Sequence, residues 1–396
     1  MDPYLIDWLN LAGRWLHMIV GIAWIGASFY FVWLDNHLHP PARVEDSDKG
    51  VGGEVWSVHG GGFYHAQKYR VAPEHLPDTL HWFKWEAYST WISGMFLLIL
   101  MYWVGAEVYT IDPTVADIGK TSAVAIGMIT LVAGWLVYDG LCRSPLGNHE
   151  TLLATVMLVL LTLAAYGLCQ VFSGRAAYIH FGAMLGTSMV ANVFFVIIPG
   201  QRELVTAKEQ GREPDPTPGL KGRQRSVHNT YFTLPVLFTM ISNHYAMTYN
   251  HPYNWLILIA ISLAGALIRV YFVARHHERN PLAPLVTAAV LLVGVFTAIA
   301  PRPAPLPKAA GPVDFARVQG IVHARCAGCH AAVPSQPGFA APPKGVMLDT
   351  PERILAQAAL IHQQSVVNRA MPLGNLTGIT EQERAVLDHW YRAVMR

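Results

Sequence analysis

The chain has 396 residues, of which 53 % are hydrophobic and only 14 % are charged. Soluble globular proteins carry about 25 % charged residues. The composition therefore excludes a disordered chain, a collagen and a disulfide-rich secreted scaffold, and it favours a membrane protein with a soluble remainder. The formal net charge of +2 is too small to indicate a nucleic-acid-binding protein.

Eight segments are long and apolar enough to be transmembrane helices, which need about 20 mostly apolar residues. The first segment lacks the basic start and the small-residue cleavage site of a signal peptide. The sequence therefore predicts a mostly α fold, with a polytopic eight-helix transmembrane bundle in residues 1–300. The segments are 15–34, 87–106, 122–141, 151–172, 176–199, 231–249, 255–273 and 285–300.

Basic residues are distributed unevenly between the two sets of loops. The loops 35–86, 142–150, 200–230 and 274–284 contain 14 Lys and Arg residues, whereas the opposite loops contain only Lys120 and Arg175 before the C-terminal region. An even number of spans puts both termini on one side, and the positive-inside rule selects that side. We expect a bacterial inner-membrane protein with periplasmic N- and C-termini.

The last 100 residues differ in character from the bundle. Residues 301–312 are rich in proline, which predicts a stiff, extended linker. Residues 313–396 have ordinary polarity and are long enough for one small domain.

This region contains Cys326-Ala-Gly-Cys329-His330, which has the spacing of a c-type haem attachment site. Two thiols three positions apart can form thioethers to both haem vinyl groups, and the adjacent imidazole then reaches the iron. A chance match or a redox-active cysteine pair is the alternative. Helical stretches before and after the motif follow the order of a class I cytochrome c. We therefore expect one covalent haem c in a periplasmic cytochrome c domain, residues 313–396.

The sixth iron ligand should lie downstream of His330. Met347 and Met371 are the candidates. Met371 precedes Pro372 in a loop about 40 residues after the haem histidine, as is usual in cytochromes c, and it is the preferred ligand. His/Met ligation raises the haem potential, which suits an electron carrier.

Three histidines lie within the predicted spans: His17, His180 and His244. Ionisable groups inside a membrane are costly and are therefore candidates for function. The predicted span limits put all three at a similar depth near the periplasmic side, where imidazoles from facing helices could ligate the iron of a haem b. Alternatively, they hydrogen-bond to carbonyls or line a polar cavity.

The loop 35–86 contains two short alternating runs around three glycines, which predicts a β-hairpin. His59, His65 and Lys68 in this hairpin offer donors for a planar anion and a base. A purely structural hairpin at the membrane surface is the alternative.

The chain resembles the bacterial membrane-bound, cytochrome-c-linked urate oxidase (urate hydroxylase) family over essentially its whole length. The similar segments are 15–26 (Trp-Leu-His-Met-Ile-Val-Gly-Ile-Ala-Trp-Ile-Gly), 54–65, 229–245, the haem motif and 368–372 (Asn-Arg-Ala-Met-Pro). The resemblance implies oxidation of urate to 5-hydroxyisourate in purine catabolism. Electrons would pass through haem c to the respiratory chain, by way of cytochrome c oxidase or a soluble cytochrome c, rather than directly to O₂.

The resemblance assigns no catalytic residue beyond the haem ligands. We take His59, His65 and Lys68 as the candidate catalytic set, with Arg14 and Glu86 as alternatives. This hairpin is expected on the cytoplasmic side, whereas haem c is expected in the periplasm; a haem b or a substrate site deep between the helices would bridge the two. Two other functions remain open: a dehydrogenase for another small substrate or quinol, and a non-enzymatic membrane-anchored cytochrome.

Overall fold

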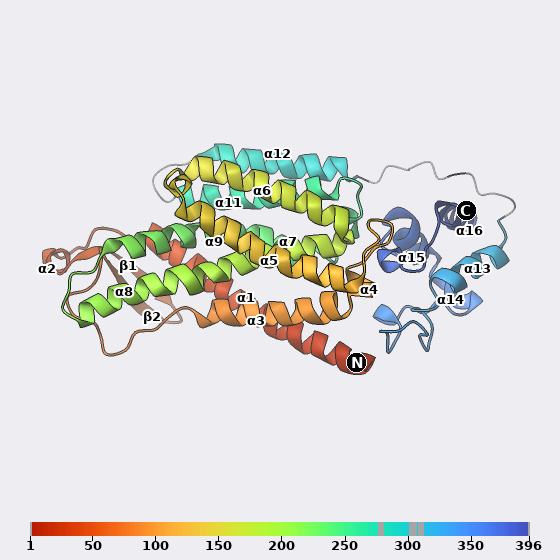
Figure 1. Cartoon of the computed structure of the whole chain (residues 1–396), viewed down its shortest axis with the longest axis horizontal. Helices are drawn as coiled ribbons and strands as arrows, with labels where there is room; N and C mark the ends of the chain where they lie inside the picture. The colour runs from red at the N-terminus through yellow and green to blue at the C-terminus, as the bar shows by residue number, and fades with distance from the viewer. Residues whose placement is uncertain (1, 276–280, 301–306, 308–312, 395–396) are drawn as a thin grey trace.

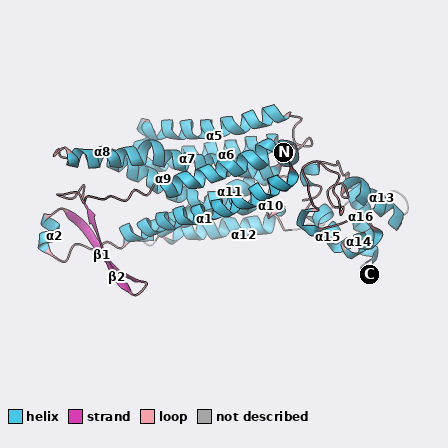
Figure 2. Ribbon diagram, turned by 90° about the horizontal axis from the view of Figure 1, so that it is seen from below, coloured by secondary structure: helices cyan, strands magenta, loops and turns pink. Residues whose placement is uncertain are grey.

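The computed structural model describes residues 2–275, 281–300, 307 and 313–394. Long helices lie side by side in one bundle, with a small helical domain at one end and a β-hairpin at the other (Figures 1 and 2). The bundle helices are α1 (Pro3–Asn36), α3 (Trp85–Leu98) continued by η1 (Ile99–Val104), α5 (Lys120–Arg143), α6 (Glu150–Val171), α7 (Gly174–Asn192) continued by η3 (Val193–Ile197) and α8 (Ile198–Glu209), α9 (Pro216–Ser242), α11 (Asn254–Arg275) and α12 (Leu282–Ala298).

Six helices of the described residues are long and apolar enough to cross a membrane: α1, α3 with η1, α5, α6, α7 with its continuation, and α11. They correspond to six of the predicted segments. The predicted count of eight is not confirmed, because the segments 231–249 and 285–300 are not in this set. The helix α12 is apolar but has only 17 residues.

The helix α9 differs from the predicted sixth span because it begins at Pro216 and ends at Ser242. Its first half carries Lys221 and Arg223, which make it polar on average. Nevertheless α9 packs against α7, α8 and α11, and the residues that it buries are largely polar. The polar face of α9 is therefore turned towards other helices, where hydropathy alone does not find it.

The predicted hairpin is confirmed. The strands β1 (Val51–His59) and β2 (Gly62–Tyr69) pair antiparallel, with His59 opposite Gly62. The connecting residues Gly60 and Gly61 have φ values of 58° and 81°, a conformation that glycine adopts without steric cost. The short helix α2 (Val44–Asp48) precedes the hairpin.

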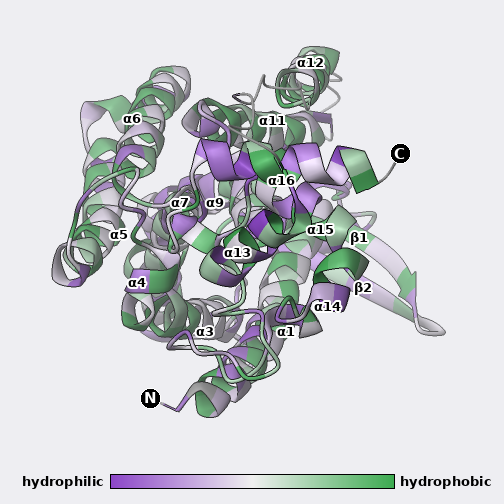
Figure 3. Ribbon diagram, turned by 90° about the vertical axis from the view of Figure 1, so that its right-hand side faces the viewer, coloured by the Kyte–Doolittle hydropathy of each residue, from purple (hydrophilic) through white to green (hydrophobic). Residues whose placement is uncertain are grey.

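Residues 313–394 pack around a hydrophobic core of their own, which includes Val318, Ile354, Leu387 and Trp390. Seen from this end, α13, α15 and α16 lie in front of the bundle (Figure 3). The elements are α13 (Phe315–Arg325), η4 (Pro343–Gly345), α14 (Pro351–Ala356), α15 (Ala358–His362), η5 (Gln363–Val367), η6 (Leu373–Asn375) and α16 (Glu381–Val394). The predicted linker 301–312 lies outside the described residues, apart from Pro307.

Candidate functional site

The two cysteines of the haem motif follow directly after α13. Cys326 is the C-terminal cap of this helix, and the backbone N–H of His330 donates to its carbonyl at 3.0 Å. Both thiols are free. Burial raises the pKa of Cys326 to about 12 and also raises the pKa of Cys329.

The imidazole of His330 is held by one ring nitrogen. Its Nδ1 lies 3.0 Å from the carbonyl oxygen of Val346, and no hydrogen bond to Nε2 occurs within the described part of the chain. Donation from Nδ1–H to a carbonyl orients an imidazole so that Nε2 can bind a metal.

Met371 lies in the loop between η5 and η6, here called the Met371 loop (residues 368–375). Its carbonyl accepts a hydrogen bond from Nη1 of the buried Arg384 at 3.2 Å, and its N–H donates to the carbonyl of Gln364 at 3.0 Å. Two free thiols, an imidazole with an available Nε2 and a thioether form a donor set that fits a covalently attached haem c.

The C-terminal domain contacts the bundle through this same loop. Nδ2 of Asn250, after the short helix α10 (Ala246–Tyr249), donates to the carbonyls of Asn368 and Arg369 at 3.2 and 2.9 Å. The turn η6 packs on α4 (Ala106–Tyr109), and a Cβ added at Gly374 would lie 3.5 Å from the carbonyl of Ile111. The candidate sixth ligand is therefore carried by the loop that faces the bundle.

The three predicted membrane histidines have different surroundings. His17 lies 2.9 Å from Oγ of Ser93 through Nδ1. His180 is fully buried, with Nδ1 2.9 Å from the carbonyl of Ala176 and Nε2 accepting from Nε1 of Trp103 at 3.1 Å. His244 is exposed in the turn after α9.

The prediction that these histidines share one depth is wrong for His17 and His180. The first helix begins at Pro3 rather than at residue 15, so His17 lies about four turns into the helix rather than in its first turn. The contacts of the two histidines on α3 and η1, Ser93 and Trp103, are ten residues apart, which is about 15 Å along a helix. These two imidazoles therefore do not flank one iron. A haem b in the bundle stays a prediction.

The hairpin residues do not converge. His65 lies opposite Trp56 and Lys68 opposite Gly53, so the alternation of side chains puts His59 and Lys68 on one face and His65 on the other. Nε2 of His65 bonds Oε2 of Glu54 at 2.9 Å. The hairpin also lies at the end of the bundle opposite the C-terminal domain (Figure 1). A catalytic role for His59, His65 and Lys68 stays a prediction.

Lys68 and Arg14 have structural partners, whereas Glu86 has none within the described ranges for one of its carboxylate oxygens. Nζ of Lys68 pairs with Oδ1 of Asp35 at 2.7 Å. Nε of Arg14 donates to Oδ1 of Asn10 at 2.6 Å, within α1. Glu86 lies in the first turn of α3, and its buried Oε2 has no hydrogen-bond partner among the residues described. Arg14 in α1 and Glu86 in α3 lie outside the hairpin that carries His59, His65 and Lys68.

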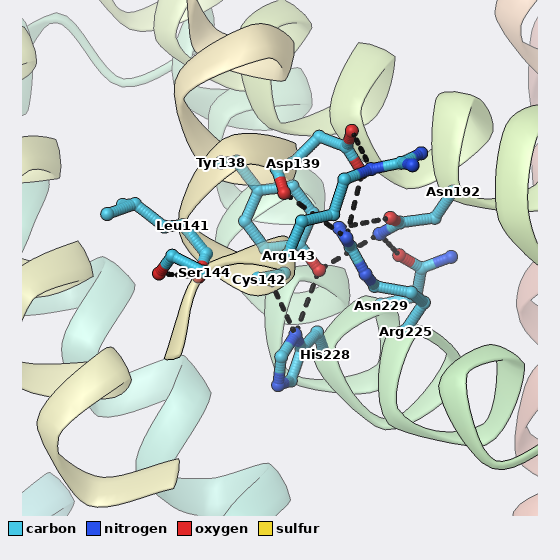
Figure 4. A network of polar contacts seen from close by, with 10 residues as sticks. All are labelled: Tyr138, Asp139, Leu141, Cys142, Arg143, Ser144, Asn192, Arg225, His228 and Asn229. Carbon is cyan, nitrogen blue, oxygen red and sulfur yellow. Dashed lines mark hydrogen bonds and ion pairs between the residues drawn. The ribbon is translucent and has the colours of Figure 1, made fainter. Parts of the chain in front are cut away.

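Sequence analysis missed a buried polar network between α5, α7 and α9 (Figure 4). Arg225, which belongs to the predicted loop 200–230, is instead buried in α9, with 3 % of its surface exposed. It donates to Oδ1 of Asp139 at 2.8 Å and to Oδ1 of Asn192 at 3.2 Å. Its guanidinium also lies 4.9 Å from the ring centroid of Tyr138.

The same network continues along α9. The Tyr138 hydroxyl lies 2.8 Å from Nδ1 of His228 and accepts from Nδ2 of Asn192 at 3.1 Å. Nδ2 of Asn192 also donates to Oδ1 of Asn229 at 2.8 Å. Residues 225, 228 and 229 have the spacing of one helix face, and this pattern was the signal in the sequence. Because its members satisfy one another, the network is a stabilising element of the bundle.

A family model described as "Urate oxidase N-terminal" matches residues 3–300. The match covers well over half of the chain and ends before residues 301–312, so it includes the bundle and the hairpin but not the C-terminal domain. No curated protein and no solved structure matches the chain.

Proposed function

The chain belongs to the urate oxidase N-terminal family, and from that premise we propose that it is a membrane-bound, cytochrome-c-linked urate oxidase. It oxidises urate to 5-hydroxyisourate in purine catabolism. Its electrons leave through the C-terminal domain to the respiratory chain rather than directly to O₂.

The proposed reaction balances without peroxide. Urate and one water give 5-hydroxyisourate, two protons and two electrons, and the added oxygen atom comes from water. Cys326, Cys329, His330 and Met371 are the residues that would hold haem c. When bound there, haem c would supply one-electron redox chemistry, with cytochrome c oxidase or a soluble cytochrome c as the next acceptor.

One observation carries the link between the two parts of the chain. The Met371 loop is docked on the bundle through Asn250 and α4, and the bundle is the part that the family model matches. This contact supports a short path from a urate site to the haem domain. A membrane-anchored cytochrome without enzymatic activity would need neither the family match nor this contact.

The proposed location is the bacterial inner membrane, with both termini in the periplasm. Six apolar helices support membrane insertion, and the uneven distribution of basic residues supports the orientation. Covalent haem c attachment outside the cytoplasm agrees with this orientation.

The test uses the purified holoprotein under anaerobic conditions. We expect urate to reduce the haem, with two electrons delivered for each 5-hydroxyisourate formed, as followed by the haem absorption band and by chromatography. Dithionite reduction of the same sample shows that the haem is competent. A dithionite-reducible haem that urate leaves oxidised would contradict the proposal. Reduction by quinol or another purine alone would favour the dehydrogenase alternative.

A further inference from the structure

Arg175 lies in the first turn of α7, at the end of the bundle nearest the Met371 loop. Its Nε donates to the hydroxyl of Tyr102 at 3.1 Å. Its guanidinium carbon lies 5.8 Å from the ring centroid of Tyr102 and 5.1 Å from that of Tyr109. These contacts hold the guanidinium against two aromatic side chains, while its two Nη groups remain without a hydrogen bond inside the described part of the chain.

The charge of Arg175 is not neutralised locally. Arg175 is partly buried, yet no carboxylate lies within ion-pairing distance of it among the described residues. Other positive charges are close by. The pKa of His244, in the turn after α9, is lowered mainly by desolvation and also by the positive charges of Arg14, Lys344 and Arg175. Asp7 is the carboxylate that acts on neighbouring Tyr109. Three positive charges (Arg14, Lys344 and Arg175) and one negative charge (Asp7) therefore act on these two side chains, and nearby Glu107 is paired with Lys120.

This positive cluster lies directly beneath the docked domain. Tyr109 is the last residue of α4, and the carbonyls of Val108 and Ile111 on either side of it are the atoms nearest to Gly374 of the Met371 loop. A ligand on Arg175 would therefore be separated from the Met371 loop by little more than the chain segment around Tyr109.

We propose that Arg175 is the anchor of a urate-binding site, with Tyr102 and Tyr109 as its aromatic walls, at the end of the bundle where the Met371 loop docks. The proposal rests on the proposed function and adds the location of its substrate. Urate is a planar monoanion at neutral pH, and a planar guanidinium fork is the side chain best suited to a flat anion with adjacent acceptors.

This location removes the conflict raised by the hairpin. The strands β1 and β2, which carry His59, His65 and Lys68, lie at the far end of the bundle from the C-terminal domain (Figure 1), so oxidation there would require electrons to cross the whole bundle. A substrate on Arg175 is oxidised at the same end at which its electrons leave. Neither an intermediate haem nor a site in the middle of the bundle is then needed.

The experiment compares R175Q and R175K with R223Q, which removes an exposed arginine of α9. Two quantities are measured on each holoprotein: the KM for urate in anaerobic turnover with oxidised soluble cytochrome c as the electron acceptor, and the Kd of urate for the dithionite-reduced protein, in which no turnover occurs. We expect R175Q to raise both constants about 10- to 100-fold, because a charge-assisted hydrogen bond is lost. R175K should recover part of the loss, and R223Q should match the wild type.

Dithionite reduction and the haem spectrum show that each variant is folded and loaded. An unchanged Kd and KM in R175Q would overturn the proposed site even if wild-type urate oxidation is confirmed. A fall in kcat alone would also overturn it, because it would assign Arg175 to domain docking. If urate fails to reduce the wild-type haem, the Kd in the reduced protein still reports separately on Arg175.

Discussion

Two arginines near opposite ends of α7 have similar aromatic neighbours but different electrostatic partners. Arg175 lies in the first turn of α7, whereas Arg225 belongs to α9 and contacts Asn192, the last residue of α7. Arg225 lies 4.9 Å from the ring centroid of Tyr138, and Arg175 lies 5.1 Å from that of Tyr109. Arg225 is paired with Asp139 and Asn192, whereas Arg175 has no carboxylate partner within the described residues. We call these the network end and the docked end of the bundle.

The counter-ion distinguishes an arginine that is structural from one that is available for a ligand. A buried guanidinium that meets a carboxylate and an amide is satisfied and holds helices together. A guanidinium that meets only rings and a hydroxyl keeps its capacity for an anion. The counter-charge, rather than the arginine or its aromatic neighbours, distinguishes the two ends.

The largest change in stability is expected when Arg225 loses its carboxylate partner and so, like Arg175, has none. Replacing Asp139 with Asn leaves the Arg225 charge buried without a counter-ion and should cost about 3–5 kcal/mol of stability. Thermal unfolding of the detergent-purified holoprotein measures the change. R143Q is the matched control, because Arg143 bonds the other oxygen of Asp139 at 2.6 Å but is 65 % exposed; its loss should cost about 0–1 kcal/mol. Equal melting temperatures for D139N and R143Q would contradict the structural role of the Asp139–Arg225 pair.

The second prediction concerns the ligand set at the docked end. M371A should retain the haem, which Cys326 and Cys329 attach covalently, but should lose the thioether that raises its potential. A redox titration should show a lower midpoint potential for the haem. Each ~60 mV decrease makes the equilibrium constant for haem reduction about tenfold less favourable. M347A is the control. A midpoint that falls in M347A and not in M371A would reassign the sixth ligand.

A smaller effect is expected from the contact that docks the domain. N250A removes two hydrogen bonds to the carbonyls of Asn368 and Arg369, which together contribute about 1–2 kcal/mol. We expect urate-dependent haem reduction to slow by about tenfold while dithionite reduction is unchanged. Stopped-flow absorbance measures both rates, and N148A at an exposed position near the network end is the control. Identical urate-dependent rates in N250A and wild type would show that this contact does not carry the electron path.

The smallest effect concerns the hairpin. The backbone N–H of Ala42 lowers the pKa of Glu54, assisted by Gln67 and His65 against the opposing effect of desolvation. A carboxyl with a lowered folded-state pKa stabilises the fold above its unfolded pKa, and this contribution is lost as the pH falls through the folded value. The protection factors of amides in β1 and β2, which compare exchange with the intrinsic rate at the same pH, should therefore fall in acid. The same experiment on E54Q should show no such fall; a pH response that persists would assign it to another group.

Local patterns in the sequence predicted several parts correctly. Six apolar segments identify helices because hydropathy is averaged over neighbouring residues. The hairpin follows from Gly60 and Gly61, which permit a tight turn wherever the chain lies. The haem motif is local as well, since covalent attachment would require Cys326, Cys329 and His330 to be close in sequence, and haem attachment stays a prediction.

The parts that were missed depend on helix partners that are distant in sequence. Arg225 looks like a loop charge until Asp139 and Asn192 are known to face it. The depth of His17 depended on where the first helix begins, and the Asp2 side chain caps that helix at Tyr4 N–H, well before the apolar run. The docked end joins α4, α7 and a loop near residue 370, and no single segment carries its signal.

The polar face of α9 bears on how the chain is made. A helix that carries Arg225, His228 and Asn229 is a poor candidate to partition into lipid alone. Its partners Asp139 and Asn192 lie in α5 and α7, which leave the ribosome earlier. Asp139 and Asn192 are synthesised before Arg225, so the partners of Arg225 can enter the membrane before α9 does. The order of the helices along the chain is therefore compatible with insertion of α9 next to α5 and α7.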